Sequence, residues 1–469
     1  MSSPPRLFFD VSFVASSTAN TGIHRVVRHL LREMIDDPAW QLLPFCVSDS
    51  GTRILDRTEV NRNIFAPFGL LGEDELSDLA SATFTDKFSR ALQKIKSHSL
   101  HRLLPAVRTF IANAVPSHAW QKLILGARRE KGSLAHLAFF LLAKVRAKAR
   151  PVELLNFCER LTAKDQVLFV DATWHVTRFS EIIQDMHDCG AQVNVVVHDV
   201  IPLQFPECVH PGLKIAFQAW FAQVARYSTR LICVSAAEAV NVRSALIANG
   251  FPAQAARVAH FNLASAQQLP GERRTVVTKK SRRQIAQIQA LPAPCFLMVG
   301  TVEPRKNHAV ALRAFTQFIE AGGVGSLLVI GAPGWNTELT QRQMAQPYSK
   351  SKPVLWLANA DDEALEAAYA RAHCVLQISI CEGYGLPVAE AIARKKNLIC
   401  SDLAVFHEIA GSYPLAYVPV SDAVALEGAL RSAASSSSQA TSANHAPNAF
   451  AALTWARSAR EIGAILRAS

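Results

Sequence analysis

Two neighbouring cations follow an apolar stretch in the second half of the chain. Residues 295–299 have the composition of a buried strand, and the turn after them carries Gly300, Arg305 and Lys306. A planar guanidinium beside an ammonium suits two adjacent phosphates and the negative charge that develops on a departing diphosphate. Open α/β sheets bind ligands at this end of their strands. The alternative is a solvated Arg-Lys pair at the start of a helix, which is common on protein surfaces.

A second turn combines glycines with carboxylates. Glu382 precedes Gly383 and Gly385, and Glu390 follows them within a stretch of helical composition. Glycine lets the backbone approach a ligand closely, and the free N–H groups of a helix start bind anions or sugar hydroxyls. The two glutamates lie well apart along the chain, so they could hold different parts of one long ligand. The alternative is a glycine turn with two surface glutamates.

The first half of the chain offers two further candidates. His198 and Asp199 end an apolar stretch, and Gly22 begins a helical stretch that contains Arg25. His198 and Asp199 would lie toward the same cleft as the cations if two sheets face each other, and a glycine at a helix start lets a phosphate approach the backbone. The alternatives are a structural histidine, an ordinary helix start and an outward-pointing Arg25.

Taken in order, these segments resemble the retaining glycosyltransferases of family 4, which have the GT-B fold, and in particular the mannosyltransferase-like enzymes of bacterial O-antigen and capsule synthesis. The mark of the family is two glutamates separated by seven residues, here Glu382 and Glu390. The resemblance covers nearly all of the chain outside residues 70–160, and the ordered combination is far more specific than any single motif. The other matching segments are TGIHRVV (21–27), VVVHDVIPL (195–203), VGTVEPRKNH (299–308) and TWARSA around Trp455.

The resemblance implies a role for each matching residue. Arg305 and Lys306 would bind the diphosphate of a nucleotide sugar, Glu390 its ribose, and Glu382 the sugar that is transferred. His198 would lie beside the reacting sugar and orient it, so the catalytic set is His198, Glu382, Arg305 and Lys306. The other donor-side residues are Gly22, Gly300, Gly383, Tyr384, Gly385 and Leu386, and the acceptor-side residues are Asp199 and Arg25.

The resemblance also implies retention of the anomeric configuration, with a leaving diphosphate that receives the proton of the acceptor. No metal and no other cofactor is expected, because the chain has no D-x-D pair and the acidic run 361–363 is typical of a helix start. One departure lies after Glu390, where the family usually has a glycine and then a proline, and this chain has Lys395 and Asn397. A left-handed helix cap is harder for lysine, so the sequence leaves the shape of this turn open.

Short apolar stretches alternate with amphipathic stretches of helix length, which is the pattern of parallel sheets joined by crossover helices. The pattern occurs twice and predicts two α/β units with parallel sheets. The resemblance implies that these are the two Rossmann-like doubly wound domains of the GT-B fold, facing a cleft. The strands predicted for the first sheet are 7–10, 42–46, 167–171, 193–198 and 231–234, and those for the second are 295–299, 327–330, 354–357, 374–378 and 398–400.

These patterns, together with what the resemblance implies about the role of each part, predict three structural units. Residues 1–285 form the acceptor-side domain, which contains a basic helical insertion at about 75–160, and residues 286–445 form the nucleotide-sugar-binding domain. Residues 446–469 form a terminal helix that crosses back to the first domain. The charged, proline-punctuated stretch 270–294 is predicted to be a linker, and the serine-rich stretch 432–449 a flexible loop.

The basic character of the chain is concentrated in one segment. The net charge is +11 over 469 residues, and residues 83–150 contain fourteen Lys/Arg against two acidic residues. Basic amphipathic helices suit an anionic membrane surface, and a solvated helical hairpin is the alternative. No nucleic-acid-binding motif accompanies this charge, so nucleic acid is not an expected partner.

The remaining features concern the cellular compartment. Nine scattered cysteines without paired spacing indicate a reducing cytosol. The apolar stretch near the start is short and interrupted by Asp10, which fits neither a signal peptide nor a membrane anchor. We therefore expect a cytoplasmic protein that lies peripherally on the cytoplasmic face of the membrane.

The expected function is transfer of a hexose from a nucleotide sugar to a glycan acceptor in surface polysaccharide synthesis. GDP-mannose or a related GDP-sugar is the first expected donor, and a lipid-linked glycan the expected acceptor. The alternative is a non-catalytic subunit that binds sugar nucleotides and acts as a scaffold at the membrane. The presence of all the matching site residues favours the enzyme.

Overall fold

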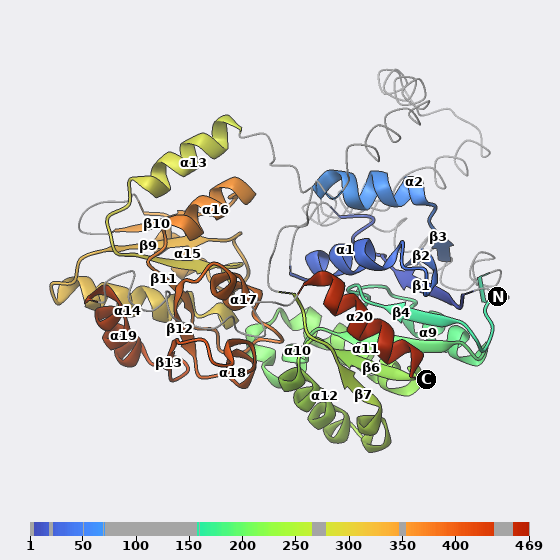
Figure 1. The fold of residues 1–469 in the computed structure, drawn as a ribbon. Helices are drawn as coiled ribbons and strands as arrows, with labels where there is room; N and C mark the ends of the chain where they lie inside the picture. The colour runs from blue at the N-terminus through green and yellow to red at the C-terminus, as the bar shows by residue number, and fades with distance from the viewer. Residues whose placement is uncertain are drawn as a thin grey trace, which may run out of the picture.

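A computed structural model describes residues 4–17, 22–49, 51–68, 70, 157–158, 160–264, 278–346, 353–435 and 454–468. These residues form two α/β domains, each built on one sheet, and the two sheets lie side by side in Figure 1. The basic segment 83–150 and most of the serine-rich stretch 432–449 lie outside the described residues.

The first domain contains a seven-stranded sheet with the order β3-β2-β1-β4-β5-β6-β7. All neighbours pair in parallel except β2 and β3, which are antiparallel at one edge. The strands are β1 (Arg6–Asp10), β2 (Gln41–Ser48), β3 (Gly51–Ile54), β4 (Gln166–Phe169), β5 (Gln192–Val197), β6 (Arg230–Cys233) and β7 (Val258–His260).

The second domain contains a six-stranded, fully parallel sheet with the order β10-β9-β8-β11-β12-β13. Its strands are β8 (Cys295–Val299), β9 (Ser326–Ile330), β10 (Val354–Leu357), β11 (Cys374–Gln377), β12 (Asn397–Ser401) and β13 (Ala416–Val418). All ten predicted strands are present at their predicted places. Strands β3, β7 and β13 were not predicted, because each has only three or four residues and lies at the edge of its sheet.

Helices follow most strands and connect them as crossovers. Those of the first domain are α1 (Gly22–Met34), α2 (Arg57–Val60), α9 (Phe179–Asp188), α10 (Ile201–Gln204), α11 (Pro211–Tyr227), α12 (Ala236–Ala248) and α20 (Trp455–Arg467). Those that accompany the second sheet are α13 (Lys279–Gln289), α14 (His308–Glu320), α15 (Glu338–Met344), α16 (Asp362–Arg371), α17 (Leu386–Ala393), α18 (Ala404–Ala410) and α19 (Ala423–Ser435).

The central strands are apolar on both faces, because helices cover both. Successive side chains of a strand point to opposite faces, and in β1 Leu7 and Phe9 belong to one buried cluster whereas Phe8 belongs to another. β8 shows the same alternation, with Leu297 in the first of these clusters and Phe296 in a third. The cluster that contains Leu7 and Leu297 therefore reaches from one domain into the other.

The stretch 270–294 is not a linker throughout, because helix α13 occupies Lys279–Gln289. Thr278 starts this helix with a capping box, since its side chain accepts a hydrogen bond from the backbone of Ser281 and the Ser281 hydroxyl contacts the Thr278 backbone. The hydroxyl of Ser281 also donates to Asp361 at the start of α16. The cap and the contact with α16 thus favour a helix in a stretch whose charges had suggested a linker. The same contact places α13 in the second domain.

The terminal helix α20 packs on the first domain beside α1 (Figure 1). Trp455 stacks on His29 of α1 with ring centroids 4.7 Å apart. At the other end of α20, Arg230 donates to the backbone carbonyls of Ile465 and Ala468, so a cation meets the negative end of the helix dipole. The chain therefore returns to its first domain after completing the second.

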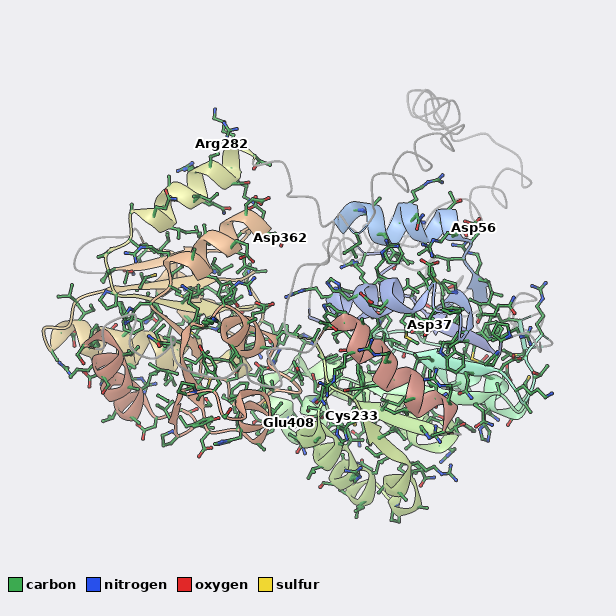
Figure 2. The ribbon with its side chains drawn as sticks, in the orientation of Figure 1. Asp37, Asp56, Cys233, Arg282, Asp362 and Glu408 are labelled. Atoms are coloured by element: carbon green, nitrogen blue, oxygen red, sulfur yellow. The ribbon has the colours of Figure 1, made fainter. Side chains whose placement is uncertain are left out.

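The two domains also meet through a helix cap. Glu408 of α18 accepts hydrogen bonds of 2.8 Å from the backbone N–H groups of Ala236 and Ala237 at the start of α12 (Figure 2). A carboxylate is favourable there because the first N–H groups of a helix have no partner within the helix and carry partial positive charge. The contact joins α18 of the second domain to the start of α12 in the first.

Candidate functional site

The candidate site lies where the order of strands in the second sheet reverses. β8 and β11 are neighbours in the middle of this sheet, yet each is followed by a helix that leads away from the other. Their carboxyl ends carry the turn with Arg305 and Lys306 and the turn with Glu382. Such a switch point leaves a crevice outside the strand ends, so the topology brings together two turns that are far apart in sequence.

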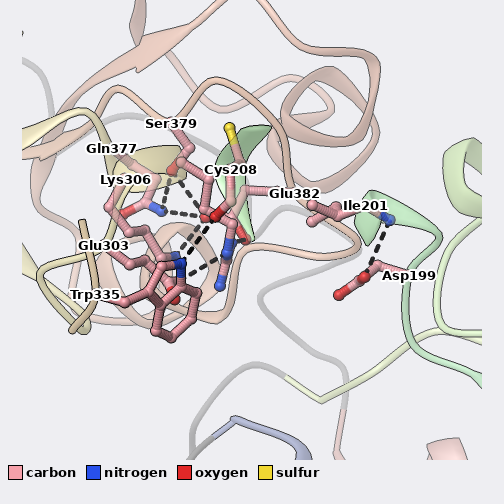
Figure 3. Close-up of polar contacts among 10 residues, drawn as sticks. Asp199, Ile201, Cys208, Glu303, Lys306, Trp335, Gln377, Ser379 and Glu382 are labelled. Atoms are coloured by element: carbon pink, nitrogen blue, oxygen red, sulfur yellow. Dashed lines mark hydrogen bonds and ion pairs between the residues drawn. The ribbon is translucent and has the colours of Figure 1, made fainter. Parts of the chain in front are cut away.

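Glu382 is the centre of a buried polar cluster (Figure 3). Its side chain is 6% exposed and forms ion pairs with Arg305, at 2.6 Å, and with Lys306. The hydroxyl of Ser379 and the amide of Gln377 donate to the same carboxylate at 2.8 and 3.0 Å. Four side chains thus hold Glu382 in one orientation at the crevice.

Charge balance determines the protonation states of this cluster. Burial alone would raise the pKa of Glu382, but the charges of Arg305 and Lys306 lower it to about 2. Burial lowers the pKa of Lys306 despite the opposing charge of Glu382. Glu303, which pairs with Arg305 at 2.7 Å, has a pKa raised by its burial. Glu382 is therefore a permanent anion and hydrogen-bond acceptor at neutral pH, and is unsuited to donating a proton.

The two turns are tied together by their backbones. The N–H of Ile380 donates to the carbonyl of Arg305 at 2.7 Å. Gly300 has φ +138°, and a Cβ there would lie 3.3 Å from Cε of Lys306. A larger residue at Gly300 would be strained and would press on the lysine. Glycine at this turn therefore allows Lys306 to fold back over the strand end.

Glu390, on helix α17 directly after the Glu382 turn, is the centre of a second buried cluster. It is 2% exposed, and its two oxygens accept hydrogen bonds of 2.6 Å from Tyr369 and from Arg25. Arg25 is not the outward-pointing surface charge that was one possibility from the sequence, because it crosses from α1 of the first domain to α17 of the second. Burial would raise the pKa of Glu390, but the Arg25 charge and the Tyr369 hydroxyl lower it.

His198 and Asp199 follow β5 and lie against the glycine turn of the second domain. The carbonyl of Val170 can only accept, so His198 donates to it from Nε2, at 2.7 Å, and Nδ1 is left as the acceptor nitrogen. Burial lowers the pKa of His198 to about 4, so the ring is neutral at neutral pH. Burial raises the pKa of Asp199, against the effect of nearby Arg305. The first domain thus contributes a neutral imidazole and a carboxylate beside the cations.

Gly383 lies directly against the backbone of the first domain. A Cβ at this position would collide with the carbonyl oxygen of His198 and would lie 2.9 Å from Cβ of Asp199. Its own carbonyl accepts a hydrogen bond of 2.9 Å from the hydroxyl of Ser235, also in the first domain. Glycine here is required by the meeting of the two backbones.

The other candidate residues occupy the same junction. A Cβ at Gly22 would lie 3.5 Å from Leu386, the first residue of α17. Gly385 has φ +97°, and a Cβ there would lie 2.6 Å from Phe406. The side chain of Tyr384 is buried and donates to the carbonyl of Leu263 at 2.6 Å, so it joins the two domains.

The turn after α17 has a left-handed cap although it contains no glycine. Lys395 has φ +53°. Its N–H donates to Ile392 and that of Lys396 to Ala391, both at 2.9 Å, which is the Schellman arrangement of a helix end. The ammonium of Lys396 also donates to two carbonyls at the end of α16, Ala370 and Ala372. These bonds hold the backbone of Lys395 in a conformation that lysine seldom adopts.

Several functional neighbours were not found from the sequence. Gln377 is a polar residue within an otherwise apolar strand, a signal that could have identified it. Tyr369 and Glu408 gave no local signal, because their partners lie in other helices and, for Glu408, in the other domain. The acidic run 361–363 does start a helix, with Asp361 accepting from the N–H of Ala364 at 3.0 Å.

Comparison with known proteins identifies the second domain. Residues 281–448 match the family model described as glycosyl transferases group 1. The serotype-specific mannosyltransferase WbdA of Escherichia coli is 36% identical over 259 residues, which are 53% of this chain and 31% of WbdA. The O-antigen chain mannosyltransferase B of Escherichia coli is 30% identical over 124 residues, 26% of this chain and 32% of the relative. The chain therefore spans about a third of the length of these relatives.

Two solved structures share the architecture of the whole chain. Trehalose-6-phosphate synthase OtsA superposes with a TM-score of 0.54 at 13% identity and covers 98% of this chain and 99% of its own. Anabaena HepE, solved with UDP and glucose, superposes with a TM-score of 0.53 at 9% identity and covers 99% of this chain and 100% of its own. The chain therefore has the GT-B fold, and residues 281–448 of its second domain are similar to the glycosyl transferases group 1.

Proposed function

We propose that the protein transfers a hexose from a nucleotide sugar to a glycan acceptor and releases a nucleoside diphosphate. The observation that carries this proposal is the buried cluster of Arg305, Lys306 and Glu382 at the switch point of the group 1 domain. Arg305 uses Nε and Nη1 for its two carboxylate partners and keeps further N–H groups for an anion. Cations beside an ionised carboxylate suit a ligand with two phosphates and a polyhydroxyl group.

In this proposal each cluster binds one part of the donor. Arg305 and Lys306 hold the diphosphate and stabilise the charge that develops on it as its bond to the sugar breaks. Oε1 of Glu382 already accepts from Lys306, Ser379 and Gln377, so its Oε2 accepts a hydrogen bond from one hydroxyl of the transferred sugar. Glu390 accepts hydrogen bonds from the hydroxyls of the ribose. His198, neutral and with Nδ1 as acceptor, lies on the acceptor side and orients the sugar.

The chemical step in this proposal is the one that the family resemblance implies. The bond between the anomeric carbon and the diphosphate oxygen breaks, and the sugar becomes a cation that resembles an oxocarbenium ion. The acceptor hydroxyl oxygen forms the new bond on the same face, so the anomeric configuration is retained. Its proton passes to the departing diphosphate. Glu382 remains ionised throughout and favours the positive charge on the sugar.

The finer features of the proposal are the substrates. The mannosyltransferase names of WbdA and of the O-antigen chain enzyme favour GDP-mannose, or another GDP-sugar, and an O-antigen type of glycan. A lipid-linked acceptor would bring the enzyme to the cytoplasmic face of a membrane, where the basic segment 83–150 could bind anionic lipid. Among the described residues, no helix has both the length and the apolar composition needed to cross a membrane.

A donor screen tests this function. The full chain is incubated with GDP-mannose, GDP-fucose, UDP-glucose or UDP-galactose and a lipid-linked glycan, and released diphosphate is measured with and without EDTA. We expect turnover with GDP-mannose that persists in EDTA and an α-linked product by NMR. Lys306→Ala should reduce turnover by at least 100-fold, the loss expected for one charge-stabilising donor. Nucleotide binding without turnover on any donor would instead support a non-catalytic scaffold.

A further inference from the structure

The contact between Arg25 and Glu390 joins the two domains at the place where the ribose is proposed to bind. Nη1 of Arg25 lies 2.6 Å from Oε1 of Glu390, and the two side chains are 28% and 3% exposed. Arg25 is on α1 of the first domain and Glu390 is on α17 of the second. Arg25 of the first domain therefore contacts Glu390, the residue of the second domain that is proposed to bind the ribose of the donor.

The contact is part of a larger match between the two helix starts. Gly22 lies three residues before Arg25 on α1, and Leu386 lies four residues before Glu390 on α17. Residues three or four apart lie on the same face of a helix, and a Cβ at Gly22 would lie 3.5 Å from the Leu386 side chain. The starts of α1 and α17 thus face each other through two contacts, one between Gly22 and Leu386 and one between Arg25 and Glu390. The ion pair can exist only while these helix starts are in contact.

Arg25 also determines what Glu390 can accept. Oε2 of Glu390 accepts a hydrogen bond from the hydroxyl of Tyr369, and Oε1 accepts one from Arg25. A carboxylate oxygen has two lone pairs, so each oxygen can accept one more hydrogen bond. Two vicinal hydroxyls need two such acceptors with a fixed orientation. Arg25 fixes this orientation and supplies the positive charge that keeps a buried carboxylate ionised.

We infer that Arg25 is a donor-positioning residue that the first domain contributes to the ribose site, where it acts through Glu390. This inference rests on the proposed function. It adds that the nucleotide is bound most tightly when the domains are closed, since only the closed arrangement places Arg25 beside Glu390. Donor binding is thereby coupled to the contact between α1 and α17.

The test measures how much the ribose hydroxyls contribute to nucleotide affinity. Binding of GDP and of 2′,3′-dideoxy-GDP to the full chain is measured by calorimetry for the wild type, Arg25→Ala, Arg25→Lys and Glu390→Gln. Arg57→Ala is the matched control, because Arg57 forms an exposed pair with Asp36 within the first domain. The readout is the ratio of the two affinities, which a general loss of stability would not change.

We expect the wild type and Arg57→Ala to prefer GDP by at least 10-fold. In Arg25→Ala, GDP affinity should fall by about 10- to 100-fold, the range for a hydrogen bond to a charged group, while dideoxy-GDP affinity changes little. Arg25→Lys should restore part of the preference, and Glu390→Gln should abolish it.

Two outcomes would overturn the inference while leaving the proposed function intact. One is an unchanged ratio in Arg25→Ala, and the other is an equal loss of both affinities, which would indicate a role in closure alone. A wild type that binds neither GDP, UDP nor ADP would overturn the proposed function itself, and this inference with it.

Discussion

Replacing Glu382 by glutamine should destabilise the second domain as well as impair the reaction. Glutamine has nearly the shape of glutamate but no charge, and its amide nitrogen would take the place of Oε2 and face the donor of Arg305. Ser379 and Gln377 could keep hydrogen bonds to the remaining oxygen. The loss is therefore mainly that of one negative charge beside two buried cations.

Two independent arguments give the size of this effect. The pKa of Glu382 is about 2, compared with about 4.5 for an ordinary glutamate. A folded-state pKa lowered by that amount stabilises the ionised protein by about 3 kcal/mol at neutral pH. Removing one partner of a buried ion pair typically costs about 3–5 kcal/mol. We therefore expect a loss of about 3 kcal/mol in the free energy of unfolding.

The measurement is urea unfolding followed by tryptophan fluorescence, at pH 6, 7 and 8. The difference between Glu382→Gln and the wild type should be constant over this range, because the contribution of Glu382 is complete above about pH 4.5 and is lost only as the pH falls toward 2. Glu366→Gln is the control, since Glu366 is 45% exposed and pairs with Arg394 in the same domain. It should change stability by less than about 1 kcal/mol. If Glu382→Gln unfolds at the wild-type urea concentration, the ion cluster does not stabilise the domain as argued.

Three further predictions concern the turn, the domain junction and the response to acid. Lys395→Gly should increase the free energy of unfolding in urea by about 0.5–1 kcal/mol, because it removes the backbone strain of a lysine in the left-handed conformation. Arg394→Gly should lower the free energy of unfolding, because Arg394 has φ −93° and is not strained. Gly383→Ala should separate the domains, because its methyl group would collide with the backbone of His198. We expect a larger radius of gyration by X-ray scattering and at least a 100-fold loss of turnover. Gly428→Ala, where the added methyl group meets open space, should change neither quantity. Several histidines should stay neutral between pH 7.5 and 5.5, because burial holds their pKa at about 3–4. The measurement is the pH dependence of their ring-proton chemical shifts by NMR, and titration of these rings within this range would contradict the neutral assignment. The histidines concerned are His24, His29, His198 and His308.

Most of the fold could be predicted from the sequence because its signals are local. A buried parallel strand such as β8 is a continuous apolar stretch, and it is readable without knowledge of its neighbours. Strand β13 has only three residues and lies partly exposed at the sheet edge, and its apolar stretch, bounded by prolines, is too short to identify a strand from the sequence. Helix α13 was missed for a related reason: its mean composition is charged, and only its cap and its contact with α16 show that it is ordered.

The sequence by itself determined the residue types that the site requires and the order in which they occur. Arg305, Lys306 and Glu382 could be placed at strand ends because the strands themselves were readable. Tertiary structure alone decided which charges meet: Glu382 with the two cations, and Glu390 with Arg25. The physical reason is that ion pairing depends on distance in space, and these partners lie 76 to 365 residues apart along the chain. The spacing of motifs can specify a helix face, but only the closing of two domains can place an arginine of the first beside a carboxylate of the second.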